Sequence, residues 1–179
     1  MRTRVGYTGG DEKNPTYHEL GGHTEAIQID FDPKKIGYAE LLELFWGAHA
    51  PCRRSFSTQY KAAVFTHDDA QRVAAEETAA KVAITRGEPV ATEVVPLKTF
   101  WRAEAYHQKY KLRYAKAIAE ELERIYPDPV AFTDSTVATR LNAWLSGYGA
   151  RADLERNAKD LGLSEEAMDD LLSRTRGLR

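Results

Sequence analysis

The alternation of hydrophobic and polar residues in the first part of the chain predicts β-strands separated by loops. Residues 23–31, HTEAIQIDF, alternate with the period of two that is typical of a half-buried strand. Shorter runs predict further strands at residues 3–7, 60–65 and 89–97. Residues 11–22 are rich in Gly, Asn and Pro, which favour turns, and this stretch is predicted to be a loop.

A helical period of apolar residues appears after the second strand. In residues 38–49, Leu41, Leu42, Phe45 and Trp46 fall on one stripe of a helix. Further helices are predicted at residues 68–85, 103–125, 132–148 and 164–174, with Asp68 or Asp69 capping the first of these and Ser164 the last.

The order of these elements indicates an α+β fold, a sandwich with helices on one face of a sheet. All predicted strands precede residue 98, and the chain after about residue 113 is predicted to be helical. We therefore divide the chain into a domain of residues 1–113 and a helical C-terminal extension of residues 114–179, with Pro127 and Pro129 near the joint.

The composition is that of an ordinary soluble protein and excludes several classes. Of the 179 residues, 42% are hydrophobic and 29% are charged, and 25 basic against 27 acidic side chains give a net charge of −2. Such a balance gives no indication of binding to nucleic acid or to an acidic membrane surface. The single cysteine, Cys52, cannot form a disulfide within the chain, which favours a reducing compartment, the cytoplasm.

Several motifs in consistent order resemble one enzyme family. GYTGG, NPTYHELGGHTEAIQIDFDPKKIGYAELLELFW, STQYKAAVFTH and TEVVPLKTFWRAEAYHQKYKLR are similar to segments of the type A peptide methionine sulfoxide reductases. The resemblance implies a ferredoxin-like two-layer sandwich built on a mixed sheet. It also implies an oxidoreductase of protein repair under oxidative stress, which returns methionine-S-sulfoxide, free or in proteins, to methionine.

The resemblance also implies roles for three residues. Glu25 in GHTE, Tyr17 in NPTY and Tyr60 in TQY match the acid and the two tyrosines that bind and protonate the sulfoxide oxygen in this family. The roles are chemically coherent, because phenol hydroxyls are donors that can stabilise charge growing on an oxygen atom. Without the motifs, each would be an ordinary strand or loop residue.

The nucleophile of the family has no counterpart in this sequence. The family attacks the sulfoxide sulfur with a cysteine in a Gly-Cys-Phe-Trp motif upstream of GYTGG, and no such motif occurs in the 179 residues. We interpret the sequence as N-terminally truncated, lacking the first strand and helix, with Met1 as an internal methionine of a longer protein. A genuine truncated paralogue is the alternative. In either case the chain by itself is predicted to be inactive as a reductase.

Cys52 allows a further interpretation. Arg53 and Arg54 follow it directly, and cations lower the pKa of a thiol. It is therefore a candidate resolving thiol, or in a third hypothesis the nucleophile of a different thiol enzyme, although an incidental cysteine is favoured. The second hypothesis is a non-catalytic module that binds sulfoxide.

No metal or bound cofactor is expected. The partners that the resemblance implies are the sulfoxide and thioredoxin or another dithiol reductant. His23 is predicted to be structural and His49 to cap a helix.

Overall fold

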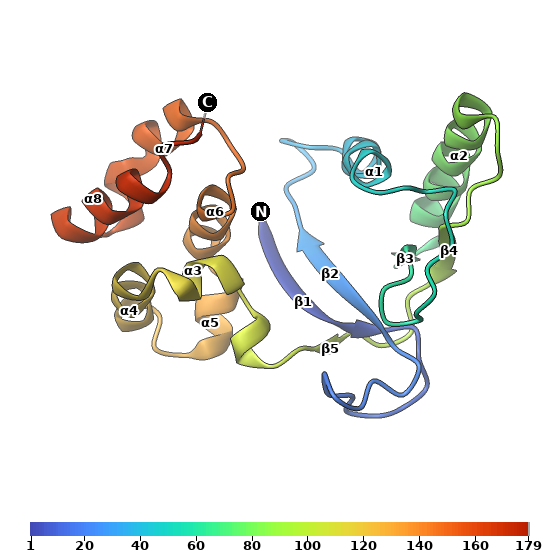
Figure 1. Ribbon diagram of the computed structural model, residues 1–179, viewed down its shortest axis with the longest axis horizontal. Helices are drawn as coiled ribbons and strands as arrows, with labels where there is room; N and C mark the ends of the chain where they lie inside the picture. Colours follow the sequence, from blue (N-terminus) through green and yellow to red (C-terminus); the bar gives the residue numbers. More distant parts are fainter. Residues whose placement is uncertain (179) are drawn as a thin grey trace. The chain divides into compact units, whose positions relative to one another are not determined.

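The structure is a computed structural model that describes residues 1–178 (Figure 1). The chain divides into two compact units. The mixed unit comprises Val5–Ile27 and Phe31–Ala103, and the helical unit comprises Met1–Arg4, Gln28–Asp30 and the chain from Glu104 onward. The division into domains predicted from the sequence, with its boundary at residue 113, stays a prediction.

The strands form two small sheets, and each sheet can be followed in Figure 1. One sheet has the order β2-β1-β5 and the other pairs β3 with β4. The strands are β1 (Arg2–Thr8), β2 (Thr24–Asp30), β3 (Ala63–Thr66), β4 (Glu93–Pro96) and β5 (Trp101–Arg102). The α+β class is confirmed, whereas the single mixed sheet of a ferredoxin-like sandwich is not.

Strands β3 and β4 run parallel, as expected when a helix connects two strands of one sheet. The connecting helix is α2 (Asp69–Arg86), and α1 (Tyr38–Gly47) packs against it. Leu42, Trp46 and Ala75 are buried between them, and the Trp46 indole N–H donates to Thr78 Oγ1 at 2.9 Å. The apolar stripe predicted for the first helix is thus the one that builds the core of this unit.

Strand β5 pairs antiparallel with β1 at a point that requires glycine. Gly6 pairs with Arg102, and a Cβ at Gly6 would lie 2.3 Å from the Trp101 carbonyl oxygen. A side chain there would therefore push the two strands apart. With only two residues, β5 is too short to give a period-two pattern and was not predicted from the sequence.

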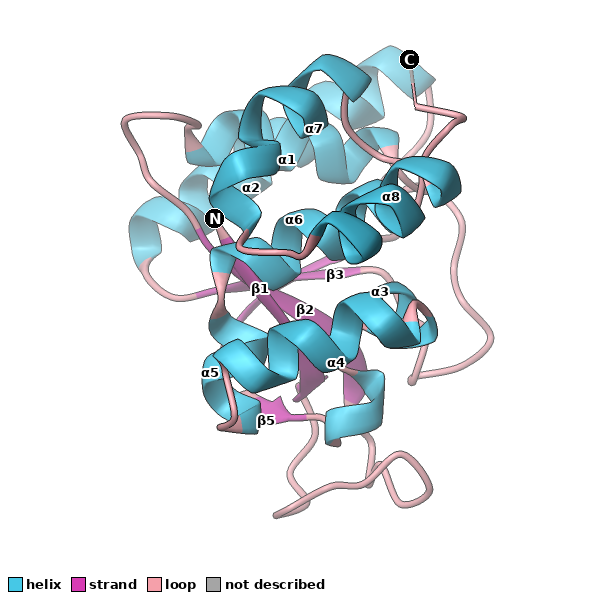
Figure 2. Cartoon of the chain, turned by 90° about the vertical axis from the view of Figure 1, so that its left-hand side faces the viewer, coloured by secondary structure: helices cyan, strands magenta, loops and turns pink. Residues whose placement is uncertain are grey.

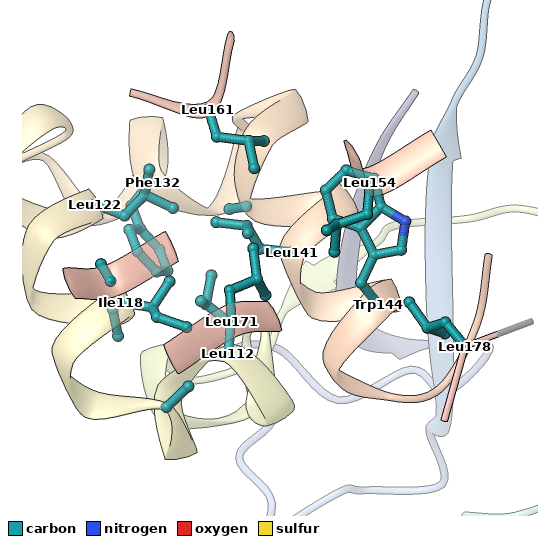
Figure 3. Packing of buried hydrophobic residues seen from close by; sticks show 14 residues of the cluster. Leu112, Ile118, Leu122, Phe132, Leu141, Trp144, Leu154, Leu161, Leu171 and Leu178 are labelled. Atoms are coloured by element: carbon teal, nitrogen blue, oxygen red, sulfur yellow. The ribbon is translucent and has the colours of Figure 1, made fainter. Parts of the chain in front are cut away.

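The helical unit contains several short helices, and Figure 2 shows α3 to α8 as cyan ribbons; within the described residues, all elements after α3 are helical. Its elements are η1 (Ala105–His107), α3 (Tyr110–Tyr114), α4 (Lys116–Ile125), α5 (Pro129–Asp134), α6 (Thr136–Leu145), α7 (Arg151–Asn157), η2 (Ala158–Leu161) and α8 (Glu165–Arg174). Leucine, isoleucine, phenylalanine and tryptophan side chains from these elements meet in one buried cluster (Figure 3).

The single helix predicted for residues 103–125 is wrong, because the chain breaks at Lys109 and Ala115. Lys109 has a φ of 53°, in the left-handed region. Its buried ammonium group donates to Thr3 O at 2.6 Å and to Thr139 Oγ1 at 2.9 Å. The break at Lys109 is thus stabilised by acceptors from distant parts of the chain, which the residues next to Lys109 in the sequence cannot predict.

The helix predicted for residues 132–148 is also divided. Ser135 separates α5 from α6, and its hydroxyl oxygen accepts from the Ala138 N–H at 2.9 Å. The cap predicted for the last helix is confirmed, since Ser164 Oγ accepts from the Ala167 N–H at 3.2 Å.

Among the residues that the structure describes, no helix has the length and apolar character needed to cross a bilayer.

A charged network in the helical unit joins the strand ends to α5. Arg4 donates to Asp30 at 2.5 Å and to Asp134 at 2.9 Å, and its third partner is Gln28 at 2.8 Å. The hydrogen bond from Arg4 is the main cause that lowers the pKa of the Asp30 carboxyl group. The network therefore stabilises the fold while Asp30 is ionised.

We expect Asp30→Asn to destabilise the protein at neutral pH and much less in acid. A carboxyl group whose pKa is lowered by folding contributes stability above its unfolded pKa of about 3.9, and this contribution is lost as the pH falls through the folded value. The measurement is the urea midpoint of both proteins at pH 7 and pH 3. Asp169→Asn, at an exposed carboxylate of α8, is the control. An equal difference at both pH values would contradict this role.

Candidate active site

Three sequence-predicted residues come from separate segments of the mixed unit. Tyr17 lies in the loop between β1 and β2, where Thr16 and Glu19 form a small backbone bridge. Glu25 is the second residue of β2, and Tyr60 lies in the loop that precedes β3. In the sequence, 35 positions separate Glu25 from Tyr60.

Hydrogen bonds fix the loop before β3 against the start of β2. The Glu25 N–H donates to Gln59 O at 3.0 Å, and the Gln59 side-chain amide donates to Glu25 Oε1 at 2.7 Å. Next to them, Thr24 Oγ1 donates to Thr58 O at 2.9 Å. These bonds hold Tyr60, the next residue, beside Glu25. Gln59 was not among the site residues predicted from the sequence, although it stands directly before Tyr60 in the TQY motif.

The two tyrosines are hydrogen-bonded to each other through their side chains. This bond is the largest cause that raises the pKa of Tyr60, followed by partial burial and by the nearby charges of Tyr17 and Glu25. With a raised pKa the Tyr60 phenol is protonated at neutral pH, as phenols ordinarily are, and can donate. Tyr60 is 59% exposed and Tyr17 is 36% exposed, so both side chains are partly accessible from solvent.

His23 organises the loop that carries Tyr17. Its ring is buried, Nδ1 lies 3.2 Å from the Gly10 N–H, and Nε2 lies 2.8 Å from Glu12 O. Since a carbonyl oxygen only accepts, Nε2 carries the proton and Nδ1 accepts from Gly10. A Cβ at Gly10 would lie 2.6 Å from the His23 backbone nitrogen, so this close contact needs glycine. The structural role predicted for His23 is confirmed.

His49 lies at the end of α1 and bonds to the backbone and to a threonine side chain. His49 Nδ1 lies 2.8 Å from Phe45 O, at the end of α1, which confirms the predicted cap, and its Nε2 lies 2.8 Å from Thr92 Oγ1. The described residues contain no group of three or more His, Cys, Asp and Glu side chains placed to hold a metal ion.

Cys52 stays a candidate resolving thiol, and its environment raises the pKa of its thiol rather than lowering it. Partial burial is the largest cause that raises the pKa of Cys52, and the neighbouring Glu88 adds to it. The thiol contacts the Glu88 carbonyl oxygen at 3.9 Å, and Arg86 lowers the pKa only slightly. The two arginines that follow Cys52 do not activate it, because both are exposed and neither is among the causes.

We expect Cys52→Ser to leave sulfoxide binding by the tyrosine pair unchanged. A thiol with a raised pKa is a poor nucleophile at neutral pH, and the contact partner of Cys52 is Glu88 rather than Glu25 or Tyr60. The measurement is the affinity of both proteins for methionine-S-sulfoxide, together with thiol alkylation rates across pH. Loss of binding in the serine variant, or fast alkylation at neutral pH, would restore the functional hypothesis for Cys52.

Comparison with known proteins places this chain in a family. A family model described as peptide methionine sulfoxide reductase matches residues 1–131. A peptide methionine sulfoxide reductase of Drosophila melanogaster is 38% identical over 170 residues, which cover 92% of this chain and 66% of that protein. The MsrA of Leifsonia xyli is 47% identical over 118 residues, which cover 62% of this chain and 69% of that protein.

Two solved structures resemble the fold. Reduced Mxr1 from Saccharomyces cerevisiae matches with a TM-score of 0.58 and 28% identity, over 63% of this chain and 70% of that one. Methionine sulfoxide reductase A of Corynebacterium diphtheriae matches with a TM-score of 0.52 and 31% identity, over 63% and 62%. The chain belongs to the peptide methionine sulfoxide reductase family, a family of oxidoreductases. It spans about two thirds of the length of the first two relatives, 66% and 69%.

Proposed function

We propose that this chain binds methionine-S-sulfoxide and positions its oxygen atom for reduction. The observation that carries the proposal is the hydrogen-bonded pair of Tyr17 and Tyr60 with Glu25 beside it. A sulfoxide oxygen is a strong hydrogen-bond acceptor, and two phenol hydroxyls can donate to it together. The membership of the family supports this assignment over an unrelated oxygen ligand.

In the proposed reaction, a thiol attacks the sulfoxide sulfur while the two phenols donate to the oxygen, with Glu25 beside them. The thiol sulfur forms a bond to the sulfoxide sulfur, and the thiol proton passes to the sulfoxide oxygen. The oxygen then moves to the thiol sulfur, while the substrate's sulfur–oxygen bond and the new sulfur–sulfur bond both break. The products are methionine and a sulfenic acid, so the sulfoxide is reduced and the thiol is oxidised. A second thiol then condenses with the sulfenic acid, which releases water and leaves a disulfide.

The proposal assigns the first thiol to a cysteine other than Cys52. In the family that thiol belongs to a Gly-Cys-Phe-Trp motif, which the 179 residues do not contain. The second thiol would come from thioredoxin or another dithiol reductant, in a reducing compartment such as the cytoplasm. The substrate would be the S epimer, free or within a protein.

Titration of the chain with methionine-S-sulfoxide, methionine-R-sulfoxide and methionine tests the proposal. We expect NMR shifts at Tyr17, Glu25 and Tyr60 with the S epimer and far weaker effects with the other two ligands. Equal responses to all three, or shifts confined to other residues, would overturn the assignment.

A module that binds sulfoxide without reducing it is the second candidate, and the raised pKa of Cys52 favours it for this chain. Dithiothreitol is added to the same samples, and formation of methionine is followed. Binding of the S epimer without turnover would support the module, and turnover abolished by Cys52→Ser would refute it.

A further inference from the structure

Two exposed tyrosines in the helical unit form a second phenol pair, which shares no residue with the site of the proposed function. Tyr110 and Tyr114 lie one helical turn apart on α3, so their side chains are neighbours on one face. Their hydroxyl oxygens are 3.0 Å apart, their ring centroids are 4.8 Å apart, and the rings are tilted by 58°. They are 51% and 67% exposed.

We propose that Tyr110 and Tyr114 are a site of oxidative modification, at which a one-electron oxidant couples the two rings into a dityrosine within α3. The oxidant would be of the class of a ferryl haem formed by a peroxidase and hydrogen peroxide. Exposure allows such an oxidant to approach both phenols, and the geometry places each ring beside its coupling partner.

The coupling balances in atoms and electrons. Each phenol loses one electron to the oxidant and one proton to solvent, which gives two phenoxyl radicals. The ring carbons next to the oxygens, one from each residue, join through a new carbon–carbon bond. The hydrogens on these two carbons move through solvent to the oxygens, which restores both phenols. In total the protein loses two electrons and two protons, and hydrogen peroxide is reduced to water.

The protonation of the pair fits this chemistry. The hydrogen bond with Tyr114 is the main cause that raises the pKa of Tyr110, so the phenol stays protonated at neutral pH and loses its proton only with its electron. Proximity then decides which rings couple. A partner on the same helix is present at an effective concentration of millimolar or more. At about 10 μM protein, coupling within the pair should exceed coupling between chains by about a hundredfold.

The link would also stabilise a short helix. A helix of five residues such as α3 has little stability of its own. A covalent bond between residues one turn apart removes conformations from the unfolded state. We therefore expect slower amide hydrogen exchange in α3 after oxidation.

The experiment treats the chain with peroxidase and limiting hydrogen peroxide, then follows dityrosine fluorescence and maps the link by mass spectrometry. Trypsin cuts after Lys109, Lys111, Arg113 and Lys116, so the predicted product is the dipeptide Tyr110–Lys111 joined to the tripeptide Tyr114–Lys116, lighter by two hydrogen atoms than the sum of the free peptides. Tyr110→Phe and Tyr114→Phe should each abolish this product.

Tyr148→Phe is the matched control, because Tyr148 is 72% exposed and lies in the same unit; this variant should keep the product. Circular dichroism verifies that each variant is folded. A link confined to Tyr17 and Tyr60, links only between chains, or no link in the wild-type chain would overturn the proposal. Sulfoxide binding is measured separately, so loss of either function leaves the other testable.

Discussion

Replacing both Tyr17 and Tyr60 by phenylalanine should weaken the binding of methionine-S-sulfoxide by about fivefold to a hundredfold. Each hydroxyl would contribute one hydrogen bond to the sulfoxide oxygen, with a net value of about 0.5–1.5 kcal/mol. Together they amount to about 1–3 kcal/mol, and every 1.4 kcal/mol is tenfold in affinity. The rings remain in place, so apolar contacts with the ligand are kept.

The measurement is the dissociation constant for the S epimer from isothermal titration or NMR shifts. Each single variant should show a part of the effect, because the remaining hydroxyl still donates. The two single effects need not add up, since the hydroxyls bond to each other in the free protein. Tyr148→Phe, in the helical unit, should bind with wild-type affinity. Undiminished binding by the double variant would remove the tyrosine pair from the site.

The parts of the fold that the sequence predicts well are those whose pattern depends on local packing. Residues 38–49 and 68–85 carry clear helical patterns, and the structure ends α1 at Gly47 and α2 at Arg86. In α2 the cap is Asp68, one of the two residues proposed, and its carboxylate accepts from the Gln71 N–H at 2.7 Å. Such signals lie within a few residues of the element they define.

The parts that the sequence did not predict depend on distant partners. The break at Lys109 needs acceptors on Thr3 and Thr139, which lie 106 and 30 positions away. The two sheets, in place of one, depend on which strands pair, and pairing between distant segments is not encoded in the period of either strand. The helix α7 was missed because its seven residues, RADLERN, show a single buried leucine, Leu154.

The motifs in the sequence identified the residues of the candidate site, but the sequence did not predict the groups that surround Cys52. The motif match selected Tyr17, Glu25 and Tyr60, and the structure brings the two tyrosines into hydrogen-bond contact with Glu25 nearby. The catalytic roles of these three residues stay a prediction. For Cys52, the adjacent arginines suggested a lowered pKa, but burial and Glu88 raise it. Adjacency in sequence does not determine which groups surround a thiol in space.

Phe132→Ala should destabilise the helical unit by about 3–5 kcal/mol. The ring is 1% exposed and lies in the main core cluster, so its loss removes buried apolar surface and leaves a cavity (Figure 3). The Arg113 guanidinium also lies 4.8 Å from the centre of the ring, in a cation–π contact. Because a domain is stable by only about 5–15 kcal/mol, this single change should remove a large part of the total.

Phe132→Leu separates the two contributions. Leucine keeps most of the apolar volume but has no π-system, and a cation–π contact contributes about 0.5–1 kcal/mol at exposed sites and about 2 kcal/mol when desolvated. Arg113 should stay in place in both variants, since it also bonds to Glu123 Oε1 and to Gln108 O, each at 2.9 Å. The free energy of unfolding is measured by urea titration of the helical circular dichroism signal. Val130→Ala is the control, because Val130 is 51% exposed. Its free energy of unfolding should lie within about 0.5 kcal/mol of the wild-type value. If alanine at position 132 costs less than about 1 kcal/mol, the cluster around Phe132 is not the core that holds the helical unit together, because filling such a site is worth several times more.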